Sequence, residues 1–129
     1  MRFAGYAAIF DRPDLGGDVV RAGAFARSLE RRPALPLLWQ HDKARPVGRI
    51  EYAKEDKRGL RVIARFAASG TGRMAAAALR EGRVAGLSFG YRTRRASGGR
   101  PRELIDVDLV EVSLVTRPMQ PRARVHAVE

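Results

Sequence analysis

The stretch that decides the fold is GLSFGY, at residues 86–91. Alternate residues of a β-strand point to opposite faces of a sheet, so Leu87, Phe89 and Tyr91 share one apolar face. Ser88 lies on the other face with a glycine on each side. Glycine inside a strand often marks a place where a ligand or another backbone approaches closely. The pattern therefore predicts a strand with a single hydroxyl standing on a smooth, accessible face.

A second stretch, WQHD at residues 39–42, carries one of only two histidines in the chain. A serine hydroxyl becomes a nucleophile when a neighbouring base takes its proton, and histidine commonly serves as that base. Ser88 and His41 are therefore candidates for an activated oxygen nucleophile. Residue chemistry alone does not show that the two side chains meet. The alternative to a catalytic pair is that Ser88 is a small strand residue and His41 a structural histidine.

Composition narrows the class of protein. The chain has 129 residues, no cysteine and two histidines, which excludes disulfides and argues against a zinc enzyme. No run approaches the ~20 apolar residues of a membrane span, and no signal-peptide core is present at the start. We expect a soluble cytoplasmic protein of one domain, residues 1–129, without metal or cofactor.

The net charge of +11, from 25 basic and 14 acidic residues, indicates an acidic partner, either nucleic acid or protein. The arginines are scattered, with the densest cluster at 92–95. Few aromatic residues lie among them to stack on bases. Composition alone leaves open whether the charge steers a partner or only keeps the surface solvated.

Periodicity and turn residues predict the elements along the chain. The expected strands are 3–10, 37–41, 47–53, 60–67, 84–93 and 104–116, and the expected helices are 22–31 and 71–81. Ser69 or Thr71 caps the second helix, which carries Met74, Ala78 and Leu79 on one side, and Gly82 ends it. The tail from about residue 122 is expected to fray. Strands joined by hairpins favour a mainly β (α+β) fold, a small antiparallel barrel or curled sheet with two flanking helices.

Five blocks in this order resemble the prohead (capsid maturation) proteases of tailed phages and gene transfer agents. They are GYAAIFDRPDLGGDVVRAGAF, LLWQHD, PVGRIEYAKEDKRGLRV, GRVAGLSFGYR and VDLVEVSLVTRPMQPRA, from Gly5 to about Ala123. That family is distantly similar to the herpesvirus assemblin serine proteases, so the resemblance implies an assemblin-like barrel. It does not separate a phage from a gene transfer agent origin.

The resemblance implies a serine endopeptidase inside an assembling procapsid in the bacterial cytoplasm. Its substrates would be the N-terminal segment of the major capsid protein or a scaffold protein, and it would also cleave itself. A homodimer or higher oligomer stays open, no membrane is involved, and nucleic acid is only an incidental partner. The alternative is a basic capsid-interior or nucleic-acid-binding β-barrel module without catalytic activity.

Carried over residue by residue, the resemblance implies Ser88 as nucleophile, His41 as base and Glu111 as the acidic third member. Assemblins use a second histidine in that role, but the other histidine here, His126, lies in the tail. Strand alternation places Asp108 on the face opposite Glu111, so without a bulge only one of the two reaches the site. The resemblance offers residues 92–95 for the oxyanion.

Overall fold

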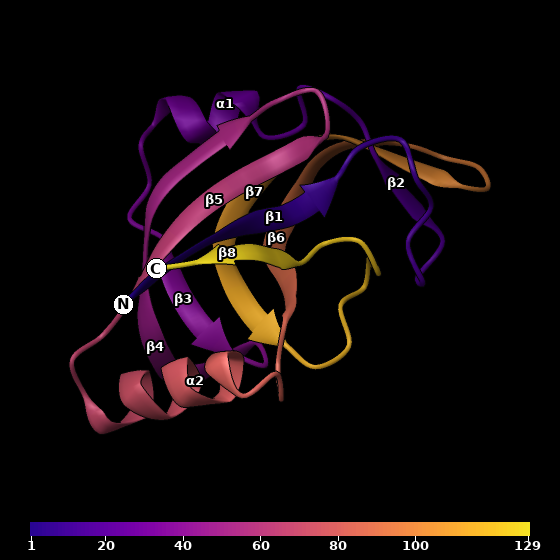
Figure 1. Ribbon diagram of the computed structural model, residues 1–129. Coiled ribbons are helices and arrows are strands. Elements are labelled where there is room, and N and C mark those ends of the chain that lie inside the picture. Colours follow the sequence, from indigo (N-terminus) through magenta and orange to yellow (C-terminus); the bar gives the residue numbers. More distant parts are fainter.

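The computed structural model describes residues 1–129, which form eight strands and two helices (Figure 1). In chain order these are β1 Arg2–Ile9, β2 Asp18–Val20, α1 Ala26–Glu30, β3 Pro36–Trp39, β4 Asp42–Glu55, β5 Gly59–Phe66, α2 Gly70–Arg80, β6 Gly86–Ser97, β7 Arg102–Val115 and β8 Val125–Val128. The predicted fold class, mainly β with two helices, is confirmed. The six predicted strands are all present, and β2 and β8 are additional.

The strands form one sheet in the order β2-β7-β3-β4-β5-β1-β8, with β6 pairing to β7. The sheet is mixed rather than purely antiparallel, because β2 and β3 both run parallel to β7. Parallel neighbours need a long crossover connection, and the chain between β3 and β7 supplies one through β4, β5, α2 and β6. The long strand β7 thereby brings β3 and β6 close together.

The C-terminal segment joins the two ends of the sheet, where the sequence predicted a frayed tail. Strand β8 pairs with β1, and the two lie side by side in Figure 1. At the start of β8 and just before it, Leu87 N donates to Ala123 O and Val125 N donates to Ala85 O, both at 2.9 Å. Tyr6 N donates to Arg124 O at 3.0 Å. The segment is therefore held between β1 and β6, and the sheet curls toward closure.

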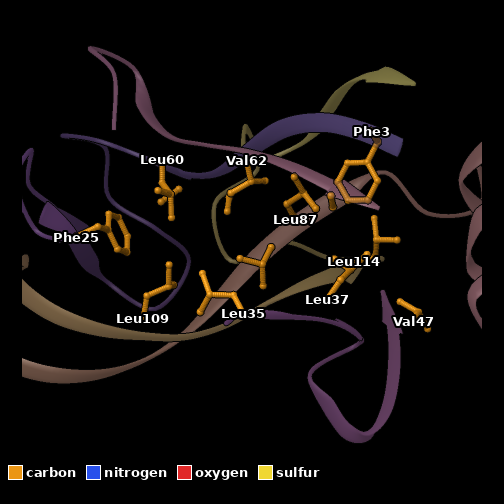
Figure 2. Packing of buried hydrophobic residues seen from close by; sticks show 14 of the residues in the cluster. Phe3, Phe25, Leu35, Leu37, Val47, Leu60, Val62, Leu87, Leu109 and Leu114 are labelled. Carbon is orange, nitrogen blue, oxygen red and sulfur yellow. The ribbon is translucent and has the colours of Figure 1, made fainter. Parts of the chain in front are cut away.

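One apolar core lies inside this curl, formed by a cluster of 25 buried residues. Figure 2 shows side chains from distant parts of the chain converging there, among them Phe3, Leu37, Leu87 and Leu114. Because Leu37 and Leu114 come from β3 and β7, the core also holds together the strands that carry the candidate site.

Both helices differ in detail from the sequence prediction. Helix α1 begins at Ala26 instead of residue 22, because Gly23 adopts a φ of +91°. The Glu55 carboxylate accepts hydrogen bonds from Gly23 N and Phe25 N in that turn. Helix α2 is capped by Ser69, whose hydroxyl accepts from Gly72 N. Neither helix is long and apolar enough to cross a membrane.

Helix α2 packs against β4 and β5 and buries a different set of side chains from the one predicted. Ala78 and Leu79 are buried as expected, together with Ala75 and Ala76. Met74 instead points away and is 37% exposed. The helix therefore contributes small residues to the core, which lets it lie close against the sheet.

Candidate active site

Ser88 lies on β6 as the alternation predicted. Its neighbours Leu87 and Phe89 face the core, where Phe89 makes an edge-on contact with Phe25 at 5.1 Å between ring centroids. Ser88 points to the opposite face and is paired with Ser113 of β7. It retains 8% of its accessible surface. Ser88 therefore lies on a paired strand and is largely buried.

The two glycines flanking Ser88 serve a purpose other than the one predicted. A Cβ atom added at Gly90 would lie 2.7 Å from Glu111 Oε1, and one added at Gly86 would lie 2.7 Å from Pro118 Cδ. The space beside the two glycines is thus occupied by Glu111 and Pro118, and it is not available to a bound peptide. Gly90 makes room for a carboxylate next to the serine strand.

His41 lies in the turn between β3 and β4, not on the strand that the sequence predicted. Gln40 and His41 have φ angles of 52° and 61°, as the two central residues of a type I′ hairpin turn require. For residues other than glycine this conformation costs about 1 kcal/mol each, and such strain clusters at functional sites. Two hydrogen bonds hold the turn against β7, His41 N to Ser113 Oγ at 3.1 Å and Gln40 N to Leu114 O at 2.9 Å.

The Glu111 carboxylate connects this turn to β7. Its Oε1 lies 2.8 Å from His41 Nδ1, and its Oε2 accepts a hydrogen bond from Ser113 Oγ at 2.7 Å. Ser113 is fully buried, so its hydroxyl links the backbone of His41 to the carboxylate of Glu111 inside the protein. No role for Ser113 was predicted from the sequence, although its position two residues after Glu111 on the same strand was a signal.

The hydrogen bond to Glu111 raises the pKa of His41 above its ordinary value, and the negative charge of the carboxylate adds to the effect. Partial burial of the ring acts in the opposite direction but is the weaker influence overall. If Nδ1 carries the proton that Glu111 accepts, the other ring nitrogen, Nε2, is left as a proton acceptor. The contact thus prepares the imidazole to act as a base.

A bulge on β7 overturns the predicted separation of Glu111 and Asp108 onto opposite faces. Gly90 pairs with Glu111, but the next residue on β6, Tyr91, pairs with Leu109. One extra β7 residue therefore reverses the alternation: Leu109 points into the core while Glu111 points away from it.

Glu111 and Asp108 consequently share a face, and their partners distinguish them. The Asp108 carboxylate contacts Arg27 Nη2 at 2.5 Å and Arg94 Nε at 3.6 Å. The hydrogen bond from Arg27 lowers the pKa of Asp108. Asp108 is thus committed to an arginine cluster, and Glu111 is the carboxylate that reaches His41.

A cavity of about 170 Å³ opens beside these groups, and both Ser88 and His41 line it. Its other lining residues are Ala7, Asp14, Gly16, Asp18, Leu87, Phe89, Tyr91, Met119 and Gln120. The four exposed residues 92–95, which the family resemblance suggested for the oxyanion, do not line this cavity. A serine hydroxyl and a carboxylate-bound imidazole therefore face one cavity, as acyl transfer requires.

Two other groups lie outside the arrangement. His126 packs against Tyr6, with 5.7 Å between the ring centroids, and lines a different cavity. It is therefore not a second histidine of this site. No cluster of three or more His, Cys, Asp or Glu side chains is arranged to hold a metal ion.

Comparison with known proteins matches the sequence of this chain to a phage protease. The prohead protease of Enterobacteria phage HK97 is 29% identical over 135 residues, a match that covers 98% of this chain and 60% of the phage protein. The chain thus spans about 60% of the length of that curated relative.

Two solved herpesvirus proteases share the fold. The KSHV protease, in complex with a hexapeptide phosphonate inhibitor, has a TM-score of 0.64 at 12% identity, covering 96% of this chain and 63% of that one. The varicella-zoster virus protease has a TM-score of 0.63 at 16% identity, covering 97% and 62%. The family model described as caudovirus prohead serine protease matches residues 1–129. The chain therefore belongs to the caudovirus prohead serine protease family.

Proposed function

We propose that this chain is a serine endopeptidase that processes capsid or scaffold protein inside an assembling phage-like head, with Ser88, His41 and Glu111 as its catalytic residues. The observation that carries the proposal is the 2.8 Å contact of Glu111 Oε1 with His41 Nδ1 beside a cavity that Ser88 also lines. Family membership supports a peptidase over the alternative of a basic binding module without catalysis.

The chemistry follows from the roles of the three side chains. Ser88 Oγ attacks the carbonyl carbon of the scissile peptide while His41 Nε2 takes the hydroxyl proton. The tetrahedral intermediate collapses to an acyl-enzyme as His41 returns that proton to the leaving amine. Water then attacks the acyl-enzyme with His41 again as base, which regenerates Ser88. Each step moves one proton through the same ring nitrogen.

Glu111 contributes electrostatics and orientation. Its carboxylate holds the imidazole in one tautomer and stabilises the imidazolium that forms in each step. Because the Glu111 side chain is 6% exposed whereas the His41 side chain is 44% exposed, the carboxylate is shielded from water and the imidazole remains accessible from the cavity. A shielded charge acts more strongly on its partner than one in water.

Co-expression tests the proposed activity. We propose to express the chain with the major capsid protein of the same genome and to determine the N-terminus of that capsid protein by mass spectrometry. The proposal expects a shortened capsid protein with wild-type protease, and full-length capsid protein with folded Ser88→Ala or His41→Ala variants. Identical processing with Ser88→Ala, or none with the wild type in assembled heads, would refute it.

A further inference from the structure

A second cavity, about 650 Å³ in volume, is lined by basic residues on the other side of the C-terminal segment. It lies over the end of β1, the β4–β5 turn and residues 122–126. Its nine lining residues are Tyr6, Ile9, Phe10, Arg12, Lys57, Arg58, Arg122, Arg124 and His126. Five of them are arginine or lysine and none is acidic. We call this cavity the basic groove.

The five cations of the basic groove have no ion-pair partner within the protein, and the single Asp56 carboxylate acts on Arg58 only through its charge. None of them forms an ion pair, whereas other arginines such as Arg27 and Arg102 are held by carboxylates. The nearby Asp56 carboxylate already binds Tyr6 Oη and the backbone N–H groups of Arg58 and Gly59. The groove therefore concentrates positive charge that is available to bind an external anion.

Neighbouring parts of the C-terminal segment line the basic groove and the cavity beside Ser88. Met119 and Gln120 line the cavity that holds Ser88, and Arg122 and Arg124, a few residues further along the same segment, line the groove. Four extended residues span at most about 14 Å. A polypeptide lying across this segment can therefore occupy both cavities with a short stretch of chain.

We infer that the basic groove is a docking site for an acidic segment of the protein substrate, a few residues away from the cleaved bond. This inference rests on the proposed function, because it treats the groove as a continuation of the substrate path past Ser88. Aspartate and glutamate side chains pair with arginine by charge-assisted, often bidentate hydrogen bonds. Docking there would raise the local concentration of the scissile bond at Ser88.

The groove fits an acidic polypeptide better than a nucleic acid. Proteins that bind single strands combine cations with aromatic rings on which bases stack. Tyr6 is the main aromatic ring at the groove, and it is already contacted by Arg58, at 5.3 Å from the ring centroid, and by His126. Its hydroxyl is bound to Asp56. The Tyr6 ring is thus already engaged within the protein, so carboxylates are the favoured ligands.

A binding assay on a cleavage-deficient protein tests this inference separately from catalysis. In the full chain carrying Ser88→Ala, we propose to measure the fluorescence anisotropy of a labelled peptide of about ten residues that alternates glutamate and serine. The same peptide with glutamine in place of glutamate is the uncharged control. A thymidine oligonucleotide of the same length tests the nucleic-acid alternative.

Two matched double variants locate the binding. Arg122→Gln/Arg124→Gln removes two charges from the groove, and Arg73→Gln/Arg80→Gln removes two exposed charges from α2, which does not line it. We expect the groove variant to bind the glutamate peptide roughly tenfold more weakly and the helix variant to bind it nearly as well as the parent. Binding should also weaken steeply as salt rises toward about 0.5 M.

Three results would overturn the inference: equal loss in both double variants, equal binding of the glutamine peptide, or groove-dependent binding of the oligonucleotide without binding of the glutamate peptide. Because the assay measures binding and not cleavage, it does not depend on which residue is the nucleophile. If the docking inference is wrong, the anisotropy measurements will show it. If the proposed function is wrong, the processing of the capsid protein will show it.

Discussion

Glu111 and His41 lie 70 residues apart in the sequence and meet through a 2.8 Å contact between Oε1 and Nδ1. The contact joins β7 to the strained turn between β3 and β4. Three features of the fold produce it: the parallel pairing of β3 with β7, the β7 bulge, and the absence of a side chain at Gly90. Each of these features can be tested by mutation.

Replacing Glu111 with glutamine should keep the shape of the site and remove its charge. We expect turnover to fall by up to roughly 10⁴, as carboxylate loss does in serine triads. His41 must be neutral to act as a base, so in the wild type kcat/KM should rise with pH through a midpoint above about 6.5. The midpoint should move to lower pH in Glu111→Gln, measured as the pH profile of cleavage of the capsid substrate.

Asp108→Asn is the matched control, because it removes a carboxylate from the same face of β7. Its partners are Arg27 and Arg94 and not His41. We expect activity within about tenfold of the wild type. A crippled Asp108→Asn beside a nearly normal Glu111→Gln would transfer the acidic role to Asp108.

The same contact should make stability depend on pH in a defined direction. The folded-state pKa of His41 is raised above its unfolded value. The stability contributed by the contact is therefore fully present below about pH 6.5 and is lost as the pH rises through the raised pKa. The difference in unfolding free energy between wild type and Glu111→Gln should be larger at about pH 5.5 than at about pH 8.5 in urea titrations. A difference that does not change with pH would contradict this.

Ser113 should act as a positioning residue, because its hydroxyl accepts from His41 N and donates to Glu111 Oε2. Ser113→Ala removes both bonds, and we expect kcat to fall by about 10- to 100-fold with KM little changed. The acid limb of the pH profile should shift as well, since Glu111 is then held less firmly. Ser97→Ala, which removes a serine–glutamate hydrogen bond to Glu103 elsewhere, should change neither. An unshifted pH profile in Ser113→Ala would reduce its role to packing.

Gly90→Ala tests whether the space next to β6 belongs to Glu111. The added methyl group would lie 2.7–2.9 Å from the Glu111 side chain, which must then move away from its place. We expect a folded protein with at least roughly tenfold lower kcat. Gly70→Ala adds a methyl group where nothing lies within 4 Å and should leave kcat unchanged. Equal activity of the two variants would show that the Glu111 carboxylate tolerates displacement.

Local patterns in the sequence predicted much of this structure, and the failures share one physical origin. Alternation around Ser88 and the cap at Ser69 act over a few residues, and both predictions are confirmed. The bulge on β7 and the turn at His41 depend on contacts between distant strands. Strict alternation therefore placed Asp108 on the wrong face, and the strand predicted over 37–41 included His41, which lies in the turn. The last strand, β8, is mostly exposed and is held by backbone pairing with β1. Such a strand needs no apolar pattern, so the sequence did not reveal it. The candidate site residues came mainly from the family resemblance, and their catalytic roles stay predictions.

The most direct test of the central claim is covalent labelling of the full chain with a fluorophosphonate, read by mass spectrometry of the digested protein. An activated serine displaces fluoride from the reagent and keeps the phosphonyl group on Oγ. The account predicts a single modification on Ser88, greatly slowed in His41→Ala and abolished by unfolding the protein before labelling. A folded wild-type protein that stays unlabelled, or is labelled at another residue, would contradict it.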